Sequence, residues 1–354
     1  MMRTAVVLFN LGGPDSPEAV RPFLFNLFRD PAIIDVRAPM RQMIAAMIAW
    51  RRAPIAREIY NQIGGRSPIL PQTRAQADAL QKELVGDTDL GEAGVFIAMR
   101  YWHPFVEETV KQVRAFAPDR IVLLPLYPQY SMTTTGSSLA SWQAAAKKAS
   151  VGAESVPTSS ICCYPVLDGL IASQADLISK ALDEAATKGS PRLLFSAHGL
   201  PKKIIEKGDP YQWQVEQCAA AIVKKLERPG LDWRVCYQSR VGPLEWIGPA
   251  TEAEIEQAGA DRKALVVAPI AFVSEHSETL VELDIEYRAV ADAAGVLAYV
   301  RVPAPGIDEQ FIAGLAGLVR SHGGRGKPGG AACGMDGKRC CPTDRSQCAM
   351  GVMS

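Results

Sequence analysis

The sequence predicts an α/β protein made of two similar Rossmann-like domains, each with a four-stranded parallel sheet flanked by helices. Short apolar runs bounded by Gly and Pro alternate with longer stretches of helical periodicity, and this alternation is typical of βαβ units. Four such runs occur in each half of the chain. The length of 354 residues agrees with two domains at a prior of roughly 150 residues per domain.

The predicted strands pair across the two halves in the same order. In the first pair, the run at 5–11 leads into GGP and the run at 192–197 leads into HGLP. The remaining pairs are 95–100 with 234–240, 121–127 with 264–271, and 159–164 with 297–302. This recurrence indicates a duplicated fold.

The halves differ by an insertion of the first half, which we place at about 37–67. We therefore expect an N-terminal domain at 1–170 that contains this insertion, and a C-terminal domain at 171–320. A Gly-rich connector with a cysteine-rich tail follows at 321–354. The insertion is rich in Met, Ile and Ala at helical spacing, which is typical of core. An apolar lip over a pocket, or a contact with a membrane surface, is the alternative.

Composition excludes several classes of protein. Lys and Arg number 38, as do Asp and Glu, so there is no basic excess to attract nucleic acid. No run approaches the roughly 18 apolar residues of a membrane span, and the N-terminus reads as a strand rather than a signal peptide. We expect a soluble cytoplasmic protein, with a peripheral membrane contact through the insertion left open.

Three of the four histidines, His103, His198 and His276, follow predicted strand ends. Ligands of open parallel sheets bind beyond the carboxyl ends of the strands. A neutral imidazole in the turn of FSAHGLP, at 195–201, is suited to act as a base near pH 7 or to bind a transition metal. No G-x-S-x-G motif accompanies it, which argues against a hydrolase nucleophile.

Acidic residues recur every fourth position in the segment PIAFVSEHSETLVELDIEY, at 269–287. Glu278, Glu282 and Glu286 form this series, with Glu275 and His276 at its start. Like charges at this spacing repel in a helix. A solvated acidic face is one interpretation; a conduit for protons or a hydrated divalent cation is the other.

Seven motifs in collinear order resemble the ferrochelatases, the enzymes that insert ferrous iron into a porphyrin. They are FNLGGPDS (9–16), IYNQIGGRSPI (59–69), MRYWHPF (99–105), PLYPQYSMTTTGSSL (125–139), FSAHGLP (195–201), YQSRVGPLEWIGP (237–249) and PIAFVSEHSETLVELDIEY (269–287). The resemblance covers nearly the whole chain. It implies a lyase of haem biosynthesis that binds its porphyrin, expected to be protoporphyrin IX, between two Rossmann-like domains.

The resemblance also implies roles for single residues. His198 and Glu278 would be the catalytic pair and would contact the substrate Fe²⁺. Glu275, His276, Glu282 and Glu286 would relay protons or metal, on a helix widened toward a π-helix. The residues that match porphyrin-binding positions are Leu11, Arg52, Tyr60, Ser67, Arg100, Tyr130, Trp246 and Phe272.

Other functions are weighed against this one. A porphyrin or metal carrier would need the pocket but not the acidic series, and a cobalt or nickel chelatase acting on a corrin-type ring is the enzymatic alternative. Coproporphyrin as substrate, the side from which iron enters and a homodimer are left open.

Four of the eight cysteines lie in the tail: Cys333, Cys340, Cys341 and Cys348. Four thiolates in so short a span can hold zinc or an iron–sulfur cluster, and the resemblance favours a [2Fe–2S] cluster. Animal members supply an internal cysteine where this chain has Met132. We expect Cys333, Cys340 and Cys348 with Cys162 as ligands, and Cys163 and Cys341 as alternates.

Overall fold

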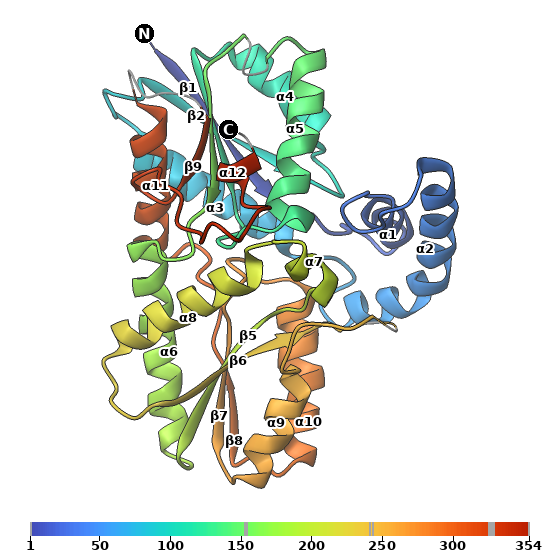
Figure 1. The fold of residues 1–354 in the computed structure, drawn as a ribbon, viewed down its shortest axis with the longest axis vertical. Helices are drawn as coiled ribbons and strands as arrows, with labels where there is room; N and C mark the ends of the chain where they lie inside the picture. Colours follow the sequence, from blue (N-terminus) through green and yellow to red (C-terminus); the bar gives the residue numbers. More distant parts are fainter. Residues whose placement is uncertain (1, 152–154, 241, 243, 325–329, 353–354) are drawn as a thin grey trace. The chain divides into compact units, whose positions relative to one another are not determined.

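The computed structural model describes residues 2–151, 155–240, 242, 244–324 and 330–352, and its chain divides into two compact units, each with one parallel sheet (Figure 1). The first unit comprises Met1–Tyr164, Leu315–Cys340 and Ala349–Ser354, and the second comprises Pro165–Gly314 and Cys341–Cys348. The division falls at Tyr164 rather than at the expected residue 170. The final helix, α11 (Glu309–Gly323), contributes to both units.

The sheet of the first unit has the strand order β2-β1-β3-β4-β9. Its strands are β1 (Arg3–Asn10), β2 (Glu92–Met99), β3 (Arg120–Pro125), β4 (Thr158–Cys163) and β9 (Gly330–Cys333). Alternate side chains of β1 point to opposite faces. Ala5, Val7 and Phe9 pack against α4 (Val106–Phe116) and α5 (Ser137–Lys148).

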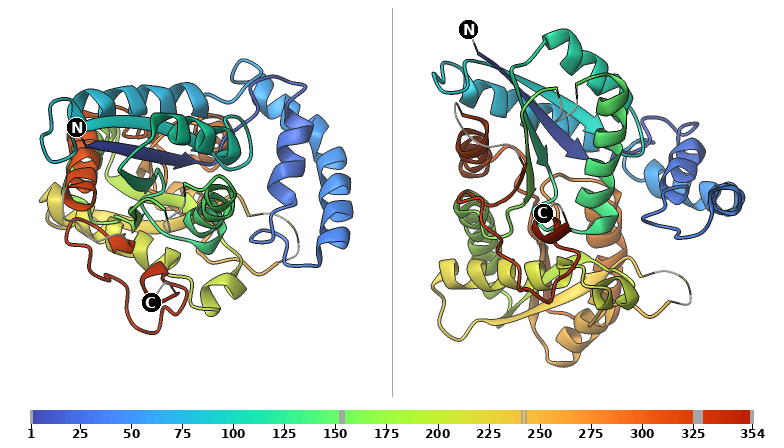
Figure 2. Two further views of the ribbon diagram at one scale, coloured as in Figure 1. Left: turned by 90° about the horizontal axis from the view of Figure 1, so that it is seen from above. Right: turned by 45° about the horizontal axis from the view of Figure 1, so that its top comes forward.

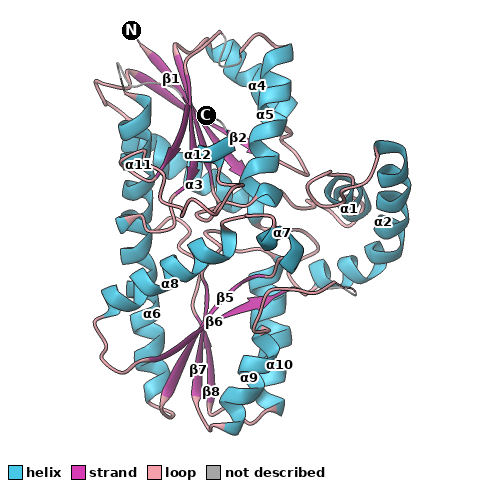
Figure 3. Ribbon diagram, in the orientation of Figure 1, coloured by secondary structure: helices cyan, strands magenta, loops and turns pink. Residues whose placement is uncertain are grey.

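The opposite face of this sheet carries α3 (Ile69–Leu84) and the second half of α11, as Figure 3 shows. Asn10 donates to Thr73 of α3 over 3.0 Å. Gly323, at the end of α11, lies against Val122 and Thr4, where a Cβ atom would meet Val122 at 2.7 Å. Helices therefore cover both faces of the sheet, as parallel sheets require.

The sheet of the second unit has the order β6-β5-β7-β8. Its strands are β5 (Pro191–His198), β6 (Asp232–Gln238), β7 (Ala264–Pro269) and β8 (Ala298–Arg301). Its helices are α6 (Asp168–Ala186), α7 (Lys202–Glu206), α8 (Tyr211–Leu226), α9 (Thr251–Ala260) and α10 (Tyr287–Ala293).

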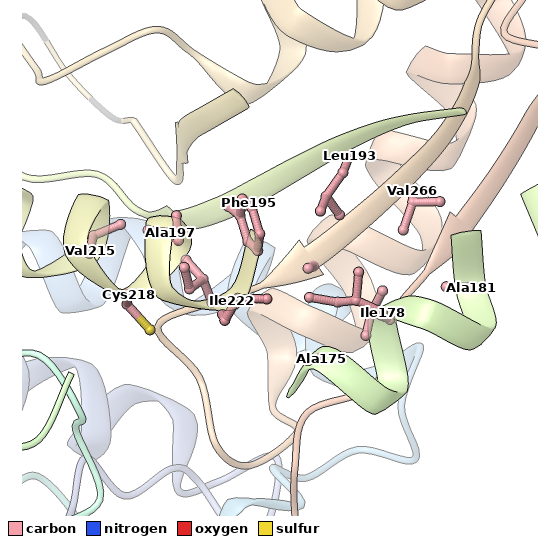
Figure 4. Packing of buried hydrophobic residues seen from close by; sticks show 14 of the residues in the cluster. Ala175, Ile178, Ala181, Leu193, Phe195, Ala197, Val215, Cys218, Ile222 and Val266 are labelled. Carbon is pink, nitrogen blue, oxygen red and sulfur yellow. The ribbon is translucent and has the colours of Figure 1, made fainter. Parts of the chain in front are cut away.

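Two hydrophobic clusters sandwich the second sheet. Leu193, Phe195 and Ala197 of β5 pack against α6 and α8 (Figure 4), while Leu194 packs with Ile255 of α9 on the other face. Both clusters consist mainly of buried apolar side chains, so burial stabilises the sheet on both sides.

The predicted α/β architecture with two parallel sheets is confirmed, and the strand order of the first four strands is the same in both units. The first sheet, however, has five strands rather than the expected four. The tail segment Gly330–Cys333 pairs in parallel with β4, where we expected only a connector and a cysteine-rich tail. Its sequence GAAC is too short and too rich in small residues to signal a strand. It pairs because the edge of β4 offers free backbone donors and acceptors.

The expected insertion at about 37–67 contains α2 (Ala38–Asn61), which packs with α1 (Val20–Phe28) as a helical hairpin. Figure 2 shows the two helices side by side. Ala45, Ala49 and Ala53 of α2 are buried, since small side chains let the helices approach closely. No helix in the described part of the chain has the length and apolarity needed to cross a bilayer.

Candidate active site and cysteine cluster

The catalytic candidates of the second unit meet where two neighbouring strands end. His198 is the last residue of β5, and Glu278 begins a π-helix, η2 (Glu278–Glu286), that follows β7. The chain leaves β5 and β7 toward opposite sides of the sheet, which is the position where open α/β sheets bind ligands. The His198 Nδ1 atom lies 2.7 Å from Glu278 Oε2. The structure thus brings together two residues that the sequence separates by eighty positions.

Each member of this pair changes the pKa of the other. Burial opposes the charged form of both groups. The nearby Glu278 carboxylate outweighs burial and raises the pKa of His198 above its usual value, and the His198 imidazolium in turn lowers the pKa of Glu278. The His198 side chain still has 40% of its surface exposed. An ion pair with an accessible imidazole is the result.

Ser239 connects the first two carboxylates of the acidic series. Its hydroxyl donates to Glu282 Oε2 over 2.6 Å and lies 3.1 Å from Glu278 Oε2, and its backbone N–H donates to Glu282 Oε1 over 2.8 Å. Its φ of 62° is in the left-handed region, which non-glycine residues rarely adopt. Ser239 is not among the residues predicted from the sequence, although it directly follows the end of β6 within the YQSRVGP motif.

Glu282 is the carboxyl group of this site that most readily holds a proton. Burial and the charge of Glu278 raise its pKa. It accepts hydrogen bonds from Gln238 Nε2 over 3.1 Å and from the Tyr287 hydroxyl over 3.0 Å. Burial and the Glu282 charge raise the pKa of Tyr287, so this phenol stays a donor. A proton-holding carboxyl therefore lies beside the ion pair.

The π-helical geometry of η2 explains how two carboxylates four residues apart share Ser239. A π-helix has more residues per turn than an α-helix, so positions i and i+4 lie closer to one line along its surface. The widening expected from the resemblance is present over Glu278–Glu286. Glu286, the third member of the series, is exposed.

Glu275 and His276 hold the start of η2. The Glu275 carboxylate lies 2.6 Å from Arg301 Nη1 and accepts from the Ala304 N–H over 2.9 Å. Burial would raise the pKa of Glu275, but Arg301 outweighs it and lowers the pKa. His276 Nδ1 accepts the Glu278 N–H over 3.1 Å, and burial lowers the pKa of His276, which favours the neutral acceptor.

The candidate porphyrin residues are divided between the units. In the second unit, Trp246 forms a bridge with Pro201, three residues beyond His198, and Phe272 packs its ring at 4.5 Å from His276. The candidates in the first unit are Leu11, Arg52, Tyr60, Ser67, Arg100 and Tyr130. Leu11 and Tyr60 lie in one hydrophobic cluster at the base of the helical hairpin.

A cavity of about 520 Å³ in the first unit contains none of these candidates. Its walls come from α3, β2 and α4, and they include His103, whose Nδ1 lies 2.9 Å from Glu108 Oε1. The His103 side chain is exposed, and it lies in the turn just before α4. Of the three strand-end histidines, His198 and His276 lie together in the second unit, whereas His103 follows β2 in the first unit.

Three buried thiols gather between β4 and β9. The sulfur atoms of Cys162, Cys163 and Cys333 all lie within 4.8 Å of one another, and Cys163 Sγ is 3.2 Å from Cys333 Sγ and 4.0 Å from Cys340 Sγ. The register of β4 and β9 shifts between Ile161 and Cys163, which lets adjacent cysteines of one strand turn toward the same point. Such a donor set suits a thiophilic metal centre.

Cys341 differs from its neighbour Cys340. Its sulfur accepts a hydrogen bond from Gln214 Nε2 over 3.0 Å in the second unit. The short segment that follows belongs to the same unit, and its Gln347 N–H donates to the carbonyl oxygen of Gly208 over 3.1 Å. Cys341 thus has a partner outside the group of three thiols.

Comparisons with known proteins agree with this geometry. A family model described as Ferrochelatase matches residues 3–323. The chain is 53% identical over 348 residues to a ferrochelatase of Phenylobacterium zucineum, covering 98% of each chain, and 53% identical over 344 residues to one of Caulobacter vibrioides, covering 96% and 97%.

Among solved structures, SirB from Bacillus subtilis with Fe³⁺ shares the fold. It matches with a TM-score of 0.50 and 12% sequence identity over 90% of this chain and 95% of that chain. At this identity the likeness concerns the fold alone. The family model and the close relatives, which extend over nearly the whole chain, establish that this protein belongs to the ferrochelatase family.

Proposed function

We propose that this chain inserts ferrous iron into a porphyrin, expected to be protoporphyrin IX, to form haem, with His198 and Glu278 as the catalytic pair. The observation that carries this proposal is their 2.7 Å contact at the carboxyl ends of β5 and β7. Insertion replaces two pyrrole protons by one Fe²⁺, so the protein must accept two protons from the porphyrin core. The site supplies both a base and a series of carboxylates.

His198, once it has given up its own proton, would take the first pyrrole proton. Its Nδ1 atom is held by Glu278, so Nε2 is the atom left for a pyrrole N–H. The second proton would pass from Glu278 through the Ser239 hydroxyl to Glu282, whose raised pKa suits a proton acceptor. Glu286, at the exposed end of η2, would release it. The substrate Fe²⁺ would contact His198 and Glu278.

The remaining candidates would bind the macrocycle and support the site. Glu275 and His276 would fix the first turn of η2 as part of the relay, because Arg301 and Glu278 hold them there. Aromatic and apolar side chains against the ring can distort it so that its nitrogen lone pairs become accessible, and remote binding energy supplies the distortion. We propose this binding role for Leu11, Arg52, Tyr60, Ser67, Arg100, Tyr130, Trp246 and Phe272.

We also propose that the helical hairpin α1–α2 contacts a membrane surface from the cytoplasmic side. Met40, Met43, Met47 and Trp50 follow one face of α2 at helical spacing and are exposed, Met43 to 71%. Arg51 and Arg52 are exposed next to them. Apolar side chains flanked by cations are the composition of helices that lie on anionic lipid.

The cysteine group is proposed to hold a [2Fe–2S] cluster. The cluster would have four cysteine ligands. We propose Cys333, Cys340 and Cys348 with one of the internal pair, Cys162 or Cys163. The short distances from Cys163 to Cys333 and Cys340 favour Cys163. Zinc is the alternative occupant, since the same donors bind it tetrahedrally. A cluster bound there would link β9 to β4.

The activity is tested by replacing His198 with Ala and measuring steady-state insertion of Fe²⁺ into protoporphyrin. We expect kcat to fall on the order of 100-fold to 10,000-fold, the range for loss of a general base. Porphyrin binding, measured by fluorescence quenching, should persist. The matched control is His103→Ala, which removes a histidine that belongs to the first unit and pairs with Glu108.

The outcomes separate the competing functions. A carrier would bind about one equivalent of metallated porphyrin and stop, whereas an enzyme makes many turnovers. Preference for cobalt or nickel and a corrin-type ring would favour the other chelatases. Near-normal turnover in His198→Ala would remove His198 from catalysis.

A further inference from the structure

Asp30 gathers hydrogen bonds from residues that are far apart in the sequence of the first unit. It lies between α1 and α2 and is only 3% exposed. Its Oδ2 atom accepts from Arg100 Nη2 over 2.7 Å, from the Tyr101 hydroxyl over 2.8 Å and from the Ser137 hydroxyl. Its Oδ1 atom accepts the Ala32 N–H over 2.9 Å. The carboxylate is thus held from several directions.

Arg100 is correspondingly restrained. It directly follows β2, its side chain is 22% exposed, and its Nε donates to Ser137 Oγ over 2.7 Å. The Asp30 carboxylate beside it cancels its charge at close range. A paired guanidinium and carboxylate act on a third group as a dipole, whose field falls off faster with distance than that of a free cation.

We propose that Asp30 is a specificity-determining residue of this ferrochelatase, which neutralises Arg100 so that the porphyrin pocket there accepts an uncharged edge of the macrocycle. The inference rests on the proposed function, in which Arg100 borders the porphyrin. An uncompensated Arg100 would attract ring carboxylates and favour porphyrins that carry more of them. With Asp30 present, additional ring carboxylates gain no attraction from Arg100, and a dicarboxylate porphyrin is preferred to a tetracarboxylate one.

The test is a double-mutant cycle with Asp30→Asn, Arg100→Gln and the double variant. The measured quantity is the ratio of kcat/KM for coproporphyrin to that for protoporphyrin, with Fe²⁺ as metal. We expect Asp30→Asn to raise this ratio about tenfold at low salt, because it uncovers a partly buried cation. Arg100→Gln should lower the ratio, and the double variant should restore it. High salt should shrink each shift.

The direction in which each variant shifts this ratio distinguishes an effect of charge from a disruption of the structure. Structural disruption would move the ratio in the same direction in both single variants, which would overturn the proposal, as would an unchanged ratio in folded, active Asp30→Asn. Should Asp30→Asn fail to fold, the double variant is compared with Arg100→Gln, and an equal ratio in these two overturns the proposal.

Two controls complete the experiment. Asp87→Asn removes a different Asp–Arg pair, in which Arg320 lies 2.9 Å from Asp87, and should leave the ratio unchanged. Dissociation constants of the metal-free porphyrins should follow the same order as the kinetic ratios. A wild-type chain that metallates neither porphyrin would instead refute the proposed function, so the two failures are distinguishable.

Discussion

At the scale of single residues, the site depends on two ionisations that oppose each other. His198 is held toward its charged form by Glu278, although a base must be neutral to accept a proton. In the proposed cycle, His198 must therefore lose its proton before it takes one from the porphyrin, although the Glu278 and Glu282 charges both raise its pKa. Turnover should rise as the pH increases through the pKa of His198, which lies above its usual 6.5.

Replacing Glu278 with Gln should lower the pKa of His198. The carboxylate that raises it is gone, while burial, which favours the neutral ring, remains. The imidazole should then lose its proton at a lower pH than in the wild type. Histidine NMR titration can measure this directly, because the chain has only four histidines.

Glu108→Gln is the matched control for this experiment, because Glu108 contacts His103 rather than His198, so the pKa of His198 should stay the same. A His198 pKa that stays the same in Glu278→Gln would contradict the ion pair. Such a result would also weaken the proposed proton path through Ser239.

At the scale of elements, the π-helix is a repeated device. One π-helix, η1 (Met132–Gly136), follows β3, and the other, η2, follows β7, the corresponding strand of the second unit. The acidic series lies on the second of them. A π-helix at this position is therefore a feature of both units, whereas the carboxylate series occurs only on η2.

The helical hairpin combines two different faces. The buried Ala side chains of α2 hold it to α1, and its Met and Trp side chains face outward, Trp50 with 65% exposure. The Met and Trp side chains of this pattern are therefore exposed rather than part of the core.

Replacing Met43 and Met47 together with Glu should weaken binding to vesicles containing anionic phosphatidylglycerol by 10-fold or more. Full burial of each apolar side chain contributes about 1.5 to 3 kcal/mol, and the added charges are repelled by the lipid. Vesicle co-sedimentation gives the affinity. The control is Val85→Glu with Ile307→Glu, two exposed apolar residues outside the hairpin. A loss of stability with unchanged vesicle binding would assign α2 to core packing instead.

At the scale of the whole molecule, the two units share the order of their first four strands but use the C-terminal tail differently. The first sheet takes its fifth strand from the C-terminal tail, and the segment Cys341–Cys348 belongs to the second unit. The proposed cluster lies where the tail strand meets β4. Loss of the proposed cluster should therefore lower the free energy of unfolding as well as remove the colour.

Cys163→Ser should yield protein without the red-brown colour and with a free energy of unfolding lower by about 3 kcal/mol, since a centre that binds only the folded state stabilises it. Iron and sulfide analysis, visible absorption and chemical unfolding provide the measurements. Cys218→Ser, which changes a buried cysteine in the hydrophobic core of the second unit, should retain the colour. Colourless wild-type protein with one zinc per chain would exclude the iron–sulfur centre.

The sequence by itself determined the α/β class, the duplication and the family, because hydrophobic periodicity and strand-end motifs are local properties that survive in a linear string. It also singled out His198 and the acidic series. It could not show that Ser239 joins Glu278 to Glu282, or that Asp30 compensates Arg100, since each contact joins residues that are distant along the chain. The strand at Gly330–Cys333 and the approach of Cys163 to Cys333 depend in the same way on pairing with β4. Only the tertiary structure decided these features, because hydrogen bonding and charge compensation act through space at a few ångströms.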